Sequence, residues 1–126
     1  FPARQAGGQR STSSFCFCPN ANLYIEGSLP DINLFIENNC KILVGTDSLA
    51  SNHSLSILEE LKVITKQFPQ ISLQTLLTWA TKNGAEFFGW DKELGTIETG
   101  KAPGIVLIKD IDGEKLTGKS SVQRLA

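Results

Sequence analysis

The residue with the clearest chemical potential in this sequence is Asp47, which follows a short apolar run. Residues 41–46 are a predicted strand, and residues 48–52 after the aspartate are mostly small and polar. In α/β enzymes, a carboxylate at the C-terminal end of a parallel strand is held by the sheet, while the loop after it stays open to ligand. This position predicts a catalytic role for Asp47. On spacing alone, a turn or N-cap aspartate is the more ordinary interpretation.

Three further polar residues follow predicted strands and are candidates for the same site: Asn22, Ser51 and Asn52. We expect them on loops, where they contact a ligand or support Asp47. The alternative is that their side chains satisfy turn backbones through local hydrogen bonds. His53 stands beside them at a predicted helix start, where exposure or capping is the expected role.

The loop at residues 45–51 also precedes a predicted helix, and helix N-termini bind phosphate through their free N–H groups. This gives a weaker hypothesis, a phosphate-binding βαβ protein. The loop has neither the G-x-x-x-x-G-K-[ST] nor the G-x-G-x-x-G pattern, so the hypothesis has little support.

The composition indicates which partners to expect. The chain has 126 residues, 40% hydrophobic and 20% charged, as in one globular domain of ordinary size. Its formal net charge is -1 and its basic residues form no stripe, so nucleic acid is not an expected partner. No apolar run approaches the roughly 20 residues that span a bilayer, and no signal peptide is recognisable. We therefore expect no membrane association and a cytoplasmic location.

Three cysteines and a single histidine limit the metal chemistry of the chain. An odd number of cysteines without a secretory signal favours reduced thiols. Cys16 and Cys18 point the same way on a strand, and we expect them to be small buried apolar residues rather than ligands. His53 alone cannot supply the several histidines that a zinc site usually uses.

The elements that position Asp47 begin after residues 1–14, which read as a loop, a disordered arm or a cloning remnant. The predicted order is a strand, a polar turn, a helix and a second strand, at residues 15–18, 20–22, 32–38 and 41–46. Pro19 ends the first strand, and Asp31 caps the helix. A strand–helix–strand unit of this spacing predicts two parallel strands.

Three helices are predicted after Asp47, at residues 54–67, 73–80 and 83–88. Ser56, or Ser51 or Asn52, caps the first helix, and Ser72 caps the second. The apolar face of the first helix consists of Leu55, Leu58, Leu61 and Ile64. The aromatic residues of this part are expected in the core: Trp79, Phe87, Phe88 and Trp90.

The sequence after Trp90 is rich in turns and short strands. Its predicted elements are a hairpin-like stretch, a strand, a turn and a last strand, at residues 94–101, 105–108, 112–113 and 122–125. They predict a small β appendage on an α/β body.

Four stretches, taken in order, resemble the C-terminal part of the metal-dependent amidohydrolases. They are C-P-N-A-N-L at 18–23, V-G-T-D-S-L-A-S-N at 44–52, A-T-K-N-G-A at 80–85 and G-T-I-E-T-G-K-A at 95–102. The resemblance is to the cytosine-deaminase-like branch, which includes chlorohydrolases, guanine deaminase and adenosine-analogue deaminases. Two positions depart from the family pattern: Ala21 stands where serine is usual, and Gly104 where the family has an aspartate.

The resemblance implies an α/β fold consisting of the last two βα units of a TIM barrel, residues 15–91, and a portion of a β-sandwich, residues 92–126. Family members run to several hundred residues and carry an H-x-H and two further metal-binding histidines that this chain lacks. The chain therefore looks like a fragment, and we expect it to be inactive in isolation.

In the complete enzyme, the resemblance implies that Asp47 ligates one divalent metal, Zn or Fe, and carries a proton from the attacking water to the leaving group. The implied substrate is a small purine-, pyrimidine- or triazine-like ring that loses an amine or a halide. A single carboxylate does not hold zinc tightly, so no tightly bound metal is expected at Asp47 in this chain.

The alternative hypothesis is a non-catalytic α/β domain that self-associates. Two strands with open edges, and helix faces without partners, favour a homo-oligomer or strand exchange.

Overall fold

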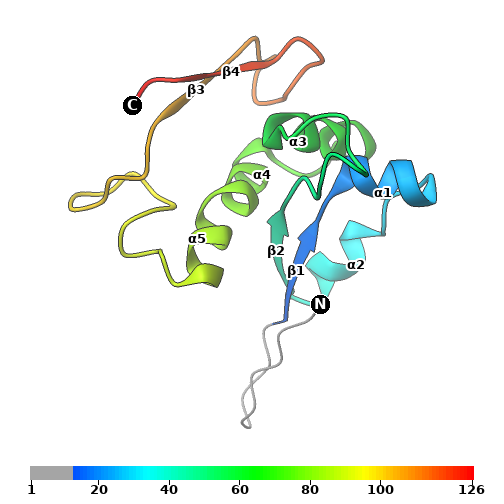
Figure 1. The fold of residues 1–126 in the computed structure, drawn as a ribbon, viewed down its shortest axis with the longest axis horizontal. Coiled ribbons are helices and arrows are strands. Elements are labelled where there is room, and N and C mark those ends of the chain that lie inside the picture. The colour runs from blue at the N-terminus through cyan, green and yellow to red at the C-terminus, as the bar shows by residue number, and fades with distance from the viewer. Residues whose placement is uncertain (1–12) are drawn as a thin grey trace, which may run out of the picture.

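The computed structural model describes residues 13–126, so the arm predicted at 1–14 lies almost wholly outside the described residues. Its sheet consists of two parallel strands, β1 (Ser14–Phe17) and β2 (Lys41–Val44). The parallel pairing predicted for the strand–helix–strand unit is confirmed. The strands stand among the helices of the chain in Figure 1.

Two helices connect these strands, α1 (Pro19–Glu26) and α2 (Ile32–Glu37). The polar turn predicted at residues 20–22 is wrong, because α1 contains it. Proline at the first helical position has the φ angle that a helix needs and no N–H to leave unsatisfied, so Pro19 starts α1. Asp31 caps α2 as predicted, since its carboxylate accepts a hydrogen bond from the N–H of Asn33.

Three helices follow β2: α3 (Ile57–Gln67), α4 (Leu73–Ala80) and α5 (Lys82–Phe88). Ser56 and Ser72 cap α3 and α4 with their side-chain oxygens, as predicted. Gly89 ends α5 in the left-handed conformation, with φ of 73°, which glycine adopts without steric cost. The predicted helix at 54–67 begins three residues too early, because Ser56 is its cap.

The last two strands form an antiparallel pair, β3 (Val106–Lys109) and β4 (Ser121–Arg124). The turn predicted at 112–113 lies between them, where Asp112 pairs with Lys115. In Figure 1 this hairpin lies across one end of the helices and carries the C-terminus.

The hairpin predicted at residues 94–101 is not formed, because this stretch consists of turns and bends. Its shape is held by Lys101, whose ammonium group donates to the hydroxyl of Thr96 and lies 2.7 Å from the carboxylate of Glu98. Gly95 has φ of 92°, and a Cβ there would lie 2.6 Å from that of Ala85 in α5. Glycine is therefore required at this point by both conformation and space.

The core forms where the sheet meets the helices. Its buried members come from β1, β2, α2, α3 and α4, and from the segment between β3 and β4. They are Phe17, Ile32, Ile42, Leu58, Leu61, Ile64, Leu76, Trp79 and Leu116. The rings of Phe15 and Phe17 pack edge-on against Phe35 of α2, with centroid distances of 4.8 and 5.0 Å. Cys16 points to the opposite face of β1 and is exposed, so its predicted burial is wrong.

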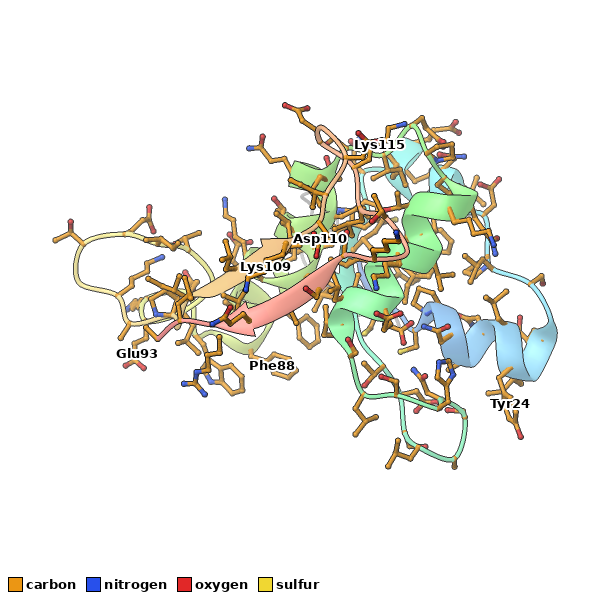
Figure 2. The ribbon with its side chains drawn as sticks, turned by 90° about the horizontal axis from the view of Figure 1, so that it is seen from above. Tyr24, Phe88, Glu93, Lys109, Asp110 and Lys115 are labelled. Carbon is orange, nitrogen blue, oxygen red and sulfur yellow. The ribbon has the colours of Figure 1, made fainter. Side chains whose placement is uncertain are left out.

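Three of the four aromatic residues predicted in the core are also exposed. Trp79 is buried, whereas Phe87, Phe88 and Trp90 are about half exposed. Phe87 packs edge-on against Phe88, and Phe88 stacks on Trp90. Phe88 and Trp90 also line a groove of about 590 Å³, to which residues of β3 contribute. Figure 2 shows Phe88 beside this hairpin.

These elements establish a mixed α/β fold. The assignment of β1 and β2 to the last two strands of a TIM barrel, and of residues 92–126 to a β-sandwich, stays a prediction. Over the described residues, no helix has the length and apolar character needed to cross a membrane.

Candidate active site

Asp47 lies in the loop that follows β2, and its carboxylate is exposed. Its backbone has φ of 58°, a left-handed conformation in which aspartate and asparagine are enriched. Ser51 donates a hydrogen bond of 2.6 Å to Oδ2 of Asp47. Asp47 is an exposed residue, and within the range 13–126 no residue donates a hydrogen bond to its Oδ1, so that oxygen is free to bind a ligand.

Asn52 holds the same loop from inside the protein. Its side chain is 5% exposed, and its amide nitrogen donates to the carbonyl of Thr46 at 2.9 Å. Its amide oxygen accepts from the N–H of Ser54 at 3.2 Å. Asn52 therefore satisfies loop backbone, as the alternative interpretation of the sequence proposed.

Glu60 of α3 completes this network, and the sequence reasoning missed it. Its side chain is fully buried. One carboxylate oxygen accepts from the amide of Asn52 at 2.6 Å, and the other accepts from the backbone N–H of Asn20 at 2.8 Å. The available signal was its register: Glu60 lies four residues before the buried Ile64, on the apolar side of the helix.

The polar residues predicted near Asp47 do not all lie together. A shallow hollow of about 220 Å³ lies between α1 and the loop after β2, lined by Asn20, Tyr24, Leu49, Ala50, Ser51, Asn52 and His53. Asn22 lies on α1 and not on a loop, so its predicted loop position is wrong, and it does not line the hollow. His53 is exposed, as expected. Tyr24 points away from the body of the protein in Figure 2.

Two thiols, those of Cys16 and Cys18, lie close to Gly45 at the start of the Asp47 loop. A Cβ at Gly45 would lie 2.9 Å from the sulfur of Cys16 and 3.3 Å from that of Cys18, so only glycine lets the chain pass here without displacing them. A hydrogen bond from Cys18 lowers the pKa of Cys16 to about 7, and the same interaction, with burial, raises the pKa of Cys18. The pair therefore loses its first proton, from Cys16, much more readily than its second, from Cys18.

The third of the four stretches that resemble the amidohydrolases, A-T-K-N-G-A, fixes α5 to the sheet. The side-chain amide of Asn83 donates to the carbonyl of Ile42 at 2.8 Å, and Lys41 forms an ion pair with Glu86. Lys41 lowers the pKa of Glu86. These contacts hold β2, and hence the start of the Asp47 loop, against α5.

A metal ion at this site would need ligands beyond the described part of the chain. Within residues 13–126, no group of three or more His, Cys, Asp and Glu side chains is arranged to hold one. The open Oδ1 of Asp47 fits the role of a single carboxylate ligand, and the rest of a coordination sphere has no counterpart among these residues.

The sequence model of the amidohydrolase family matches residues 8–124, and the chain belongs to this family. A 5-methylthioadenosine/S-adenosylhomocysteine deaminase of Bacillus thuringiensis (strain Al Hakam) is 32% identical over 97 residues. The deaminase of the same name from Bacillus cereus (strain G9842) matches equally. Each match covers 71% of this chain and 22% of the relative, so the chain spans less than a quarter of these relatives.

Two solved structures have a similar fold. An adenosine deaminase from Xanthomonas campestris, solved with bound zinc, is 26% identical with a TM-score of 0.65, covering 75% of this chain and 23% of that one. A guanine deaminase of E. coli is 27% identical with a TM-score of 0.66, covering 79% and 24%. The sequence-based assignment to an amidohydrolase fragment is thus confirmed.

Proposed function

We propose that this chain is the part of a metal-dependent amidohydrolase that carries its catalytic carboxylate, Asp47. The observation that supports this most directly is how the two oxygens of that carboxylate are bonded. One oxygen is fixed by Ser51, and the other is open at the C-terminal end of β2, where α/β enzymes place catalytic groups.

In the complete enzyme, Asp47 would be one of the residues that hold a divalent metal, and the metal would supply the activation of a water molecule. The carboxylate of Asp47 would accept a proton from the attacking water and give it to the leaving nitrogen. Ser51 keeps the carboxylate in one orientation through its bond to Oδ2. Asn52 acts on the loop backbone, and a substrate contact by Asn22 stays a prediction.

The relatives favour deamination of a purine nucleoside or base over dechlorination, because those described above are named as deaminases. Zinc is the favoured metal, since the Xanthomonas structure contains it, and iron is the alternative. A cytoplasmic location, and the absence of nucleic-acid and membrane partners, stay predictions.

The test is made on the longest protein encoded at the source locus that contains this chain. Loaded with zinc, it should release ammonia from at least one of adenosine, 5-methylthioadenosine, S-adenosylhomocysteine and guanine. The 126-residue chain alone should release none. A full-length protein that is folded and zinc-bound, but inactive on all four and on a chlorinated triazine, would contradict the proposal.

A second candidate function, self-association, is favoured by the apolar surface of the chain. Tyr24, Leu49 and Leu55 are more than half exposed, and within residues 13–126 β1 pairs only with β2, which leaves a free edge on each strand. Such surfaces favour association. We expect dimers or larger species in sedimentation velocity, increasing with concentration. A monomer at every concentration would argue against this function.

A further inference from the structure

A buried carboxylate without a cation partner is the least expected feature of this chain. Glu60 is fully buried, and the ion pairs among residues 13–126 all involve other acidic residues. Burying a charge is unfavourable unless hydrogen bonds compensate for the lost water. Here the two compensating donors come from two separate segments, the start of α1 and the loop after β2, so Glu60 influences the position of one segment relative to the other.

Each carboxylate oxygen of Glu60 accepts a hydrogen bond from the segment that follows a different strand. The N–H of Asn20, at the start of α1, lies three residues beyond the end of β1. The amide of Asn52 binds the other oxygen, and the same amide nitrogen binds the carbonyl of Thr46, directly before Asp47. Glu60 thus connects the segment after β1 with the loop that presents Asp47.

We propose that Glu60 is a positioning residue for the candidate active site, which sets the orientation of Asp47 through Asn52 and the carbonyl of Thr46. This inference rests on the proposed function of Asp47 as ligand and proton acceptor. Groups that hold a metal ligand in place without touching the metal orient that ligand and support its chemistry.

The chemistry of the two donors requires a carboxylate at this position. Both partners of Glu60 are N–H groups, at 2.8 and 2.6 Å, and each needs an acceptor. A glutamine has nearly the same shape but only one acceptor oxygen. Glu60→Gln therefore turns an amide NH₂ toward one of the two donors and breaks that bond with little change in volume.

The first test measures amide hydrogen exchange in this 126-residue chain. Glu60→Gln should speed exchange at Asn20 and at Ser51, whose N–H binds the carbonyl of Ser48 inside the Asp47 loop, by roughly tenfold or more. Glu59→Gln is the matched control, because Glu59 makes its ion pair with Lys62 at the surface. If exchange at Ser51 is unchanged while that at Asn20 rises, Glu60 holds only α1 and the proposal is wrong.

The second test uses the longest natural protein that contains this chain, loaded with zinc. Glu60→Gln should lower kcat by about 10- to 100-fold and leave KM little changed, while Glu59→Gln matches the wild type. Ile64→Val removes a buried methyl group from the same helix without touching the network, so it separates lost stability from lost positioning. An equal fall of kcat in Ile64→Val and Glu60→Gln would overturn the proposal. A wild-type protein without activity would contradict the function of Asp47, and the exchange test would still decide the role of Glu60.

Discussion

Replacing Asp47 by asparagine, in the longest natural protein that contains this chain, should lower kcat by about 10³-fold or more. Loss of a general acid–base group alone lowers the rate by about 10²- to 10⁴-fold. The same substitution also removes a charged metal ligand. Asparagine keeps an acceptor oxygen for Ser51 and tolerates the φ of 58° at this position. The fold should therefore survive, and steady-state kinetics at saturating zinc measure the loss.

Asp91→Asn is the matched control for this prediction. Asp91 is exposed in the turn after α5, and the substitution makes the same chemical change away from the candidate site. Its kcat should equal that of the wild type. Activity of Asp47→Asn within a few fold of the control would show that the carboxylate neither binds the metal nor carries the proton.

The sequence was a good guide to elements whose ends have a local cause. Asp31, Ser56 and Ser72 each bind an N–H two or three residues ahead, and such capping depends on neighbours in the chain. The helix α1 was missed for a related reason. Pro19 was interpreted only as the end of a strand, although proline at the first helical position also starts helices.

Burial of the aromatic residues could not be predicted in the same way. Phe87, Phe88 and Trp90 are as apolar as Trp79, but they lie at the end of α5, where the chain turns away toward β3. Whether a side chain there is covered depends on distant elements, and local pattern does not contain that information.

In the candidate site, too, features with a local cause could be predicted from the sequence, and contacts between distant residues could not. The position of Asp47 after a strand could be predicted from the short, continuous apolar run that precedes it. The pairing of Glu60 with Asn20 joins residues 40 positions apart, and no spacing rule connects them. A charged residue on the apolar side of a helix is the one local sign of such a contact.

Leu61→Ala should destabilise the chain by about 3 kcal/mol, whereas Leu55→Ala should change its stability by less than about 0.5 kcal/mol. The sequence placed both leucines on one apolar face, but Leu61 is 2% exposed and Leu55 is 59% exposed, ahead of the first turn of α3. Truncation of Leu61 leaves a cavity next to Glu60, while truncation of Leu55 removes atoms that water already surrounds. The midpoints of urea unfolding for the two variants measure the difference, since both make the same chemical change. Equal midpoints would mean that α3 does not pack its Leu61 face against the sheet, and the buried environment of Glu60 would then be lost with it.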